Sequence, residues 1–177
     1  GAFPRRHPLS LGMVGMHGMY WSNIAVEEAD LVLGIGMRFD DRVIGRPGTF
    51  APNAKIIHID IDSSQINKNV KTDIGLTGDA KGIIKALIPL TVNQHRLEWF
   101  ARIAELQYKH PSLEVPESEV LMPQYVLSRI NRRLQAAEDP IVVTGVGQHQ
   151  MWSGQFFFLD NPNSFISSGG LGVMGFE

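Results

Sequence analysis

The sequence predicts an α/β fold with a Rossmann-like parallel sheet flanked by helices. Two short apolar runs, at residues 30–36 (DLVLGIG) and 55–62 (KIIHIDID), are typical of strands that are covered on both faces. Apolar residues at near-helical spacing precede the first run, at residues 19–29. Strands that alternate with helices in this way indicate βαβ units and therefore a parallel sheet.

The other elements of this domain follow in order. Ser63 or Ser64 can cap a short helix directly after the second strand. Residues 73–78 predict a third strand, and a helix begins at Asp79. The apolar residues of that helix share one face: Ile83, Ile84, Leu87 and Ile88. Residues 1–91 are therefore predicted to form a central, nucleotide-binding-like α/β domain.

The pattern changes after residue 91. A helical spacing of apolar residues predicts an amphipathic connector, formed by Leu97, Phe100, Ile103, Ala104 and Leu106. A polar stretch with Pro111, Pro116 and Pro123 suits a surface linker. Residues 123–137 then predict a helix, and residues 141–144 a strand. We therefore assign residues 92–123 to a helical connector and linker, and residues 124–177 to the first part of a second α/β domain.

Composition excludes several classes of function. The chain has 177 residues, 44% of them apolar, which is enough to bury a core. Its net charge of −2 and the lack of a basic stretch argue against nucleic acid as a partner. Because the chain has no cysteine, disulfides and thiolate metal sites are excluded. No apolar run approaches the roughly 20 residues that span a bilayer, so we expect no membrane partner and a soluble, intracellular protein.

Three segments of the first domain carry candidate binding residues. Residues 11–18 (LGMVGMHG) have regularly spaced glycines. Residues 34–43 (GIGMRFDDRV) place charged side chains just past a strand, where ligands of open α/β sheets collect. Asp60 stands near the end of the next strand, and an acidic residue at that place commonly accepts hydrogen bonds from an adenosine ribose.

Each of these signals also has a purely structural interpretation. Arg38 can form an exposed ion pair with Asp40 or Asp41, which contributes under about 1 kcal/mol. The methionines of residues 11–18 can fill gaps in a core. Asp60 can cap the turn that follows it.

Two glycine-rich stretches stand near the carboxyl end of the chain. Residues 141–152 (IVVTGVGQHQMW) lead from a strand through glycines into a helix start, where backbone N–H groups can hold an anionic phosphate. Residues 167–176 (SSGGLGVMGF) allow the backbone to approach a flat cofactor. The alternative is a glycine-rich turn without a ligand. His149 is not expected to bind a metal because no second ligand stands at a suitable spacing.

The order of the segments in residues 1–91 resembles the central, FAD-binding domain of the acetolactate synthases (acetohydroxyacid synthases), a family of thiamine-diphosphate enzymes. The resemblance covers residues 8–176. It implies a set of FAD contacts that are spread over several loops. These are Met13, Val14, Gly15, Met16, His17, Gly36, Met37, Arg38, Phe39, Asp40, Arg42, Val43, Asp60, Ile61, Asp79, Ala80, Gly169 and Gly170.

The carboxyl-terminal stretches resemble the start of the family's thiamine-diphosphate-binding domain. The resemblance implies cofactor contacts at Gln148, His149, Gly172, Val173 and Met174. In the family, the magnesium ligands would lie beyond residue 177 and the activating glutamate in an amino-terminal domain. We therefore expect no catalytic residue and no metal ligand within residues 1–177, and no turnover by this stretch alone.

The resemblance also implies an activity. The whole protein would condense two pyruvates, or pyruvate and 2-oxobutyrate, with release of CO2 in branched-chain amino acid biosynthesis. Its cofactors would be FAD, in a structural role, thiamine diphosphate and Mg2+. A homodimer or homotetramer, with scope for a small regulatory subunit, would work in the cytoplasm, or in the plastid of a plant. Pyruvate oxidase, glyoxylate carboligase and a non-catalytic flavin-binding module stay open as alternatives.

Overall fold

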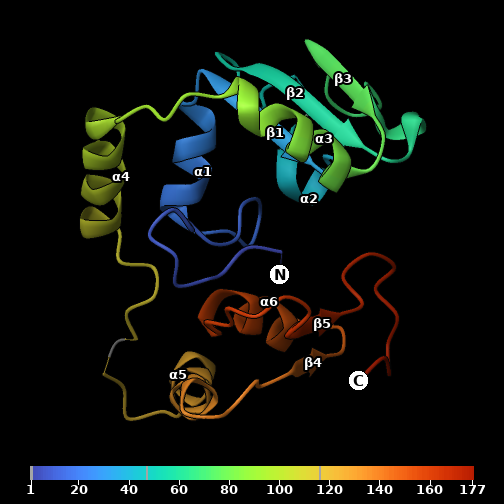
Figure 1. Cartoon of the computed structure of the whole chain (residues 1–177). Coiled ribbons are helices and arrows are strands. Elements are labelled where there is room, and N and C mark those ends of the chain that lie inside the picture. The colour runs from blue at the N-terminus through green and yellow to red at the C-terminus, as the bar shows by residue number, and fades with distance from the viewer. Residues whose placement is uncertain (1, 47, 116) are drawn as a thin grey trace. The chain divides into compact units, whose positions relative to one another are not determined.

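The computed structural model describes residues 2–46, 48–115 and 117–177, so Pro116 of the predicted linker lies outside the described residues. The chain forms two compact units (Figure 1). The first unit contains residues 14–16 and 20–110. The second unit contains the amino-terminal residues up to Met13, residues 17–19 and the chain from Pro111 onward. The domain division at residues 91 and 123 remains a prediction.

The first unit is built on a parallel three-stranded sheet. Its strands are β1 (Leu31–Ile35), β2 (Lys55–Asp60) and β3 (Ile74–Thr77), in the order β1-β2-β3. All three predicted strands are confirmed, and so is the α/β class with a parallel sheet flanked by helices. The helices of this unit are α1 (Tyr20–Glu27), α2 (Asp41–Ile44), η1 (Ser63–Gln65), α3 (Ala80–Leu87), η2 (Ile88–Leu90) and α4 (Leu97–Lys109).

Aspartates begin the short helices that follow the strands. Asp40 caps α2 and Asp79 caps α3, each by accepting a hydrogen bond from a first-turn backbone N–H. The prediction that Ser63 or Ser64 caps the turn after β2 is wrong. Asp62 caps η1, because its carboxylate accepts from the Ser64 backbone N–H at 2.9 Å.

A buried hydrophobic cluster of the first unit lies against β1 and β2. Phe39, Ile44 and Ile56 form a buried cluster, with Val32, Met37, Phe50 and Val70 packed around it. The ring of Phe39 occupies the space beside Gly34, where an added Cβ would lie 2.5 Å from the ring. Phe39 also has a left-handed backbone, with φ of 45°. A non-glycine residue keeps this conformation only where its surroundings hold it.

Helix α4 packs against α1, and the two helices stand side by side in Figure 1. Ile103 and Leu106 are the buried residues of α4. Arg102 forms ion pairs with Glu28 at 2.6 Å and with Glu105 at 2.9 Å. The hydrogen bond from Arg102 holds the pKa of Glu28 below its ordinary value. The segment predicted as a connector is thus a packed helix of the first unit.

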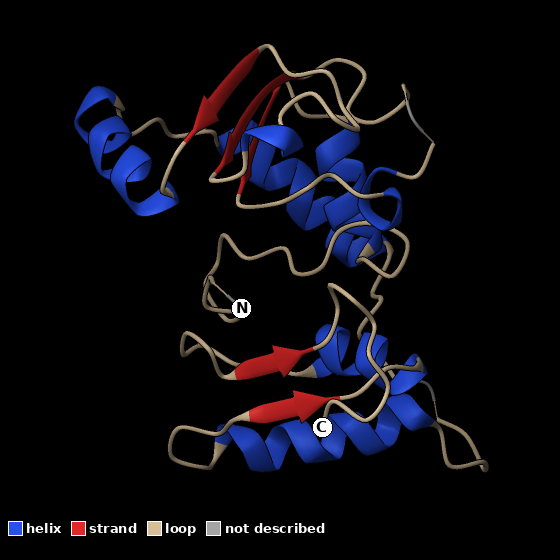
Figure 2. Ribbon diagram, turned by 90° about the vertical axis from the view of Figure 1, so that its right-hand side faces the viewer, coloured by secondary structure: helices blue, strands red, loops and turns tan. Residues whose placement is uncertain are grey.

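The second unit contains a βαβ element. After α5 (Pro123–Gln135), β4 (Val142–Thr144) leads through α6 (Gln148–Phe156) to β5 (Phe165–Ser167). The two strands are parallel, with Val142 opposite Phe165 and Thr144 opposite Ser167 (Figure 2). The helix of residues 123–137 and the strand of residues 141–144 are confirmed, whereas β5 was not predicted.

Side chains tie the remaining segments of the second unit to this element. Asn131 of α5 is buried, and its Oδ1 accepts a hydrogen bond from the backbone N–H of Phe158 at 2.9 Å. The guanidinium of Arg5 lies 5.2 Å from the centre of the Phe158 ring. Arg6 forms an ion pair with Asp160. Within the described residues of both units, no helix combines the length and apolar character that crossing a membrane requires.

We predict that Gly34→Ala destabilises the first unit by about 1–3 kcal/mol, the usual cost of overpacking a core. The added Cβ would lie 2.5 Å from the Phe39 ring. Gly82→Ala is the matched control, because its Cβ meets only the Asp79 carboxylate at 3.6 Å and lies within α3. Gly82→Ala should raise the free energy of unfolding by up to about 1 kcal/mol, because alanine favours the helix more than glycine does. Urea denaturation measures both, and equal stabilities would contradict the packing of Phe39 on Gly34.

Candidate functional site

A cavity of about 470 Å³ lies at the carboxyl ends of β1 and β2 in the first unit. This is the edge of a parallel sheet where ligands are expected. The residues lining it are Gly36, Met37, Arg38, Phe39, Asp40, Val43, Asp60, Asp62 and Gln65. Seven of these, all except Asp62 and Gln65, belong to the predicted FAD set. The structure therefore brings together the loop after β1 and the acidic end of β2, as the sequence suggests.

The loop after β1 supplies charge and an open backbone to this cavity. Gly36 has φ of +60°, and an added Cβ would meet nothing within 4 Å. The Arg38 Nε donates to an Asp40 carboxylate oxygen at 3.2 Å, and the Arg38 side chain is about half exposed. The other Asp40 oxygen accepts from the Arg42 backbone N–H. The predicted ion pair of Arg38 thus exists, and it lies at the wall of the cavity.

The end of β2 forms an acidic wall. Asp60 accepts a hydrogen bond from the backbone N–H of Asp62 at 2.9 Å, so Asp60 also caps the turn after its strand. Hydrogen bonds from Ser64 hold the pKa of Asp62 below its ordinary value. Asp62 is therefore ionised at neutral pH and supplies a second carboxylate beside Asp60. Ribose hydroxyls donate readily to carboxylates, which makes this wall suitable for a nucleoside.

Asp62 and Gln65 line the cavity and were not predicted from the sequence. The Gln65 amide donates to Asp62 at 3.3 Å. Their position in the sequence could have predicted this role. Both residues follow directly after β2, in the turn that lies at the carboxyl end of that strand, where the cavity is.

Part of the LGMVGMHG segment lies directly beside the loop after β1. The Met16 backbone N–H donates to the Arg42 carbonyl at 2.7 Å. Asn23 holds Gly15 from the other side, through hydrogen bonds to its N–H at 2.7 Å and to its carbonyl at 3.0 Å. Met16 is 64% exposed, so it does not fill a core gap. Val14 also belongs to the first unit, near these residues in the chain.

The other members of the segment belong to the second unit. Met13 lies near Gly154 of α6, since a Cβ there would meet its side chain at 3.2 Å. The carbonyl of His17 accepts from the Gln155 amide at 2.8 Å. The predicted contacts Met13 and His17 are thus held within a different unit from Val14, Gly15 and Met16.

The predicted adenosine contacts are neighbours at the edge of the sheet. The backbone N–H of Gly78 donates to the Asp60 carbonyl at 2.9 Å, which joins the end of β3 to the end of β2. Asp79 and Ala80 follow directly, with Asp79 capping α3. Ile61 is exposed.

In the second unit, both glycine-rich stretches follow the carboxyl ends of paired strands. Residues 145–147 follow β4 and residues 168–176 follow β5. Gln150 is buried, and its amide donates to the Ser167 hydroxyl at 2.5 Å, which connects α6 to β5. The second stretch folds back on itself, because the Gly172 N–H donates to the Ser168 carbonyl at 2.7 Å.

The predicted thiamine-diphosphate residues lie on these loops. Helix α6 begins at Gln148 without a side-chain cap, so the backbone N–H groups of its first turn have no competing side-chain acceptor there. Gln148 and His149 are exposed. Gly172 has φ of +67°, and an added Cβ would meet nothing within 4 Å. Met174 is 73% exposed. Gly169 and Gly170 lie at the turn after β5.

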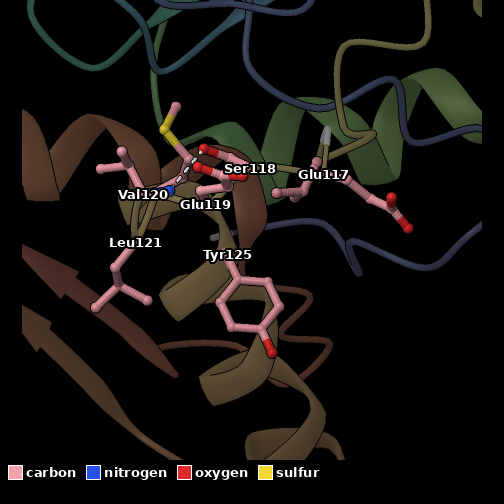
Figure 3. Close-up of a pocket in the computed structure, with 8 residues that line it drawn as sticks. Glu117, Ser118, Glu119, Val120, Leu121 and Tyr125 are labelled. Carbon is pink, nitrogen blue, oxygen red and sulfur yellow. Dashed lines mark hydrogen bonds between the residues drawn. The ribbon is translucent and has the colours of Figure 1, made fainter.

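Another cavity, of about 730 Å³, lies in the second unit at the start of α5 (Figure 3). Val115, Glu117, Ser118, Glu119, Val120, Leu121, Met122 and Tyr125 line it. None of these described residues belongs to a predicted site. Figure 3 shows the Glu117 carboxylate and the Tyr125 hydroxyl extending in different directions, so these two polar groups do not converge. Among the residues that the structure describes, no cluster of three or more His, Cys, Asp or Glu side chains could hold a metal.

Comparison with known proteins identifies the family. Residues 1–87 match the model of the thiamine pyrophosphate enzyme, central domain, and residues 145–177 match that of the C-terminal TPP binding domain. The chain belongs to the thiamine pyrophosphate enzyme family. The cavity lies in the part matched to the central domain, and the two glycine-rich loops after β4 and β5 lie in or next to the part matched to the cofactor-binding domain.

Relatives of known name narrow the comparison. The chain is 44% identical over 177 residues to acetolactate synthase isozyme 1 large subunit of Escherichia coli. The aligned region covers 99% of this chain and 31% of that relative. It is 45% identical to a probable acetolactate synthase large subunit of Methanocaldococcus jannaschii, covering 99% and 31%. It is 41% identical to acetolactate synthase 3, chloroplastic, of Brassica napus, covering 99% and 28%. The chain thus spans about a third of the length of these relatives, and their names favour an enzyme over a non-catalytic flavin-binding module.

We predict that Gly15→Ala separates the LGMVGMHG segment from the loop after β1. Its Cβ would lie 2.3 Å from the Arg42 carbonyl oxygen, and its φ of +99° is unfavourable for alanine. Gly36→Ala is the control, since its φ of +60° is also unfavourable but its Cβ meets nothing. Gly36→Ala should lower the free energy of unfolding by about 1 kcal/mol. Gly15→Ala should lower it by about 1–3 kcal/mol more than the control does. Thermal unfolding measures the stability of both variants, and hydrogen exchange of the Met16 amide reports on its bond to Arg42. Equal losses of stability in the two variants would refute the close contact between Gly15 and Arg42.

Proposed function

We propose that the protein is the catalytic subunit of an acetolactate synthase. The supporting observation is that bacterial, archaeal and plant acetolactate synthases match 99% of this chain at 41–45% identity. In this proposal the whole protein joins two pyruvates into 2-acetolactate, or pyruvate and 2-oxobutyrate into 2-aceto-2-hydroxybutyrate, and releases one CO2. The reaction belongs to branched-chain amino acid biosynthesis.

The loops of the second unit fit thiamine diphosphate. The backbone N–H groups at the start of α6, with Gln148 and His149, would hold the diphosphate end. The loop after β4 is closely approached from outside, because the side chain of Glu177 lies where a Cβ on Gly145 would be. Gly172 and Val173 would lie against the aminopyrimidine ring, and Met174 would support its apolar face. When bound, the cofactor supplies the electron sink for decarboxylation and for forming the new carbon–carbon bond.

The cavity of the first unit fits the adenosine diphosphate part of FAD. Arg38 would pair with the pyrophosphate, for which a guanidinium is the suitable planar donor. Asp60 would accept from the ribose hydroxyls, and Asp79 and Ala80 would lie near the adenine. The open side of Gly36 would allow the backbone to approach the ligand. FAD would act there as a structural element that orders these loops. Mg2+ would be held by residues outside residues 1–177.

The assembly and location follow from the same proposal. The whole protein would form a homodimer or homotetramer. The bacterial and archaeal relatives are named large subunits, which supports a small regulatory partner. One plant relative is named chloroplastic, so a plant protein would work in the plastid and a bacterial one in the cytoplasm.

We predict that this chain binds FAD, and that Arg38→Ala and Asp60→Ala each weaken the affinity. The loss of one charged hydrogen bond should cost about 1.5–3 kcal/mol. Arg46→Ala is the control, since Arg46 is exposed and does not line the cavity. Calorimetric titration of all four proteins measures the effect. Saturable binding that both site variants retain in full would refute the assignment of this cavity.

We predict that the full-length protein forms acetolactate from pyruvate, and that Met174→Ala lowers its turnover by about ten- to a hundredfold, as misplacement of a reactive group does. Leu171→Ala is the control, because Leu171 is 92% exposed on the same loop and is not a predicted contact. Because both side chains are exposed, neither change should alter folding. A full-length protein that converts pyruvate to acetate or glyoxylate to a condensed product, without acetolactate, would contradict the proposed reaction.

A further inference from the structure

His58 lies beneath the cavity of the first unit and is not among its lining residues. It belongs to β2 and is only 1% exposed. Its Nε2 lies 2.6 Å from the Met37 carbonyl oxygen and 3.9 Å from an Asp60 carboxylate oxygen. Its ring meets the Phe39 ring edge-on, with centres 4.9 Å apart. One buried polar side chain therefore contacts residues on both walls of the cavity.

The contact with Met37 fixes the tautomer of His58. A carbonyl oxygen can only accept a hydrogen bond, so the short Nε2···O contact requires a proton on Nε2. The Nε2–H of His58 therefore anchors the Met37 carbonyl.

This anchor sets the course of the loop after β1. In a trans peptide the carbonyl of one residue and the N–H of the next point in opposite directions. Because His58 holds the Met37 carbonyl inward, the Arg38 N–H is turned away from the buried ring. The next residue, Phe39, has a left-handed backbone with φ of 45° and is 2% exposed. The ring contact with His58 helps to hold that strained conformation.

Packing alone does not explain the residue. Position 58 lies within an apolar strand on the same face as Ile56, which belongs to the buried cluster, and an apolar side chain would fill the space without a polar group to satisfy. A leucine there would leave the Met37 carbonyl without its donor. Position 58 instead holds a histidine, whose buried Nε2 contacts the loop that lines the cavity.

We propose that His58 is a positioning residue for nucleotide binding, and that its Nε2–H holds the Met37 carbonyl so that the loop of residues 36–40 keeps the shape of the cavity. The inference rests on the proposed binding of FAD in that cavity. It adds a role for a residue that would not itself touch the ligand.

The test compares three variants of the full chain by titration with FAD, with ADP as a second probe, below the unfolding temperature of each variant. His58→Leu removes the donor, and His58→Gln keeps an amide donor near the Nε2 position. Ile59→Val is the matched control for stability, because Ile59 is fully buried on the opposite face of β2. We expect His58→Leu to weaken FAD binding at least tenfold, His58→Gln to stay within about threefold of the parent, and Ile59→Val to lower the unfolding temperature without changing affinity.

A second measurement keeps the two proposals distinguishable. Nitrogen chemical shifts of the His58 ring should show the proton on Nε2 in the parent chain. The amide resonances of residues 38–40 should move in His58→Leu and stay in place in His58→Gln. If the parent binds neither FAD nor ADP, the proposed function of the cavity fails, and these resonances decide the role of His58. An Nδ1-protonated ring, unmoved loop resonances, or unchanged FAD affinity in a folded His58→Leu would each overturn the inference.

Discussion

The side chain of Phe39 is buried in space that β1 leaves empty at Gly34, and the geometry of the cavity depends on this contact. A Cβ at position 34 would lie 2.5 Å from the ring. With its ring buried there, the main chain at Phe39 takes a left-handed turn that places Arg38 and Asp40 at the end of the sheet. His58 and Ile56 close the same space from β2. The site is therefore formed by core packing first and by charged residues second.

The aspartates at the strand ends combine two roles that the sequence presents as alternatives. Asp40, Asp62 and Asp79 cap helices, and Asp60 caps the turn after β2. Capping uses some of the acceptor positions on each carboxylate, and a carboxylate has about four. The backbone hydrogen bonds also fix the side-chain rotamers, so the remaining oxygen lone pairs have a defined direction. A structural cap is thus compatible with ligand binding at the same residue.

The sequence predicted α1, β1 to β3, α3, α4, α5 and β4 from apolar runs and from the helical spacing of apolar residues. It missed α2 and β5, because α2 is a single turn within a charged loop and β5 has only two apolar residues. His58 was not singled out because a lone histidine in the apolar run KIIHIDID carries no spacing signal. Its role depends on Met37, which is 21 residues away in the chain. Gln65 was missed for a similar reason, because its partner Asp62 was not recognised as a cap.

The places of the two glycine-rich loops of the second unit can be predicted from the sequence, whereas the conformations of their residues cannot. Parallel pairing of β4 with β5 brings both loops to one edge of the sheet, since Thr144 and Ser167 are opposite each other at the strand ends. The buried amide of Gln150 then fixes their separation through Ser167. Beyond this point the second loop is joined by hydrogen bonds from the Gly172 N–H to the Ser168 carbonyl and from the Ser168 hydroxyl to the Val173 carbonyl, and it exposes Leu171, Val173 and Met174. Such exposure of adjacent apolar side chains is unfavourable in water, and it is relieved when a ligand with an apolar ring covers the loop. In the proposed function, the aminopyrimidine ring of thiamine diphosphate would cover these side chains.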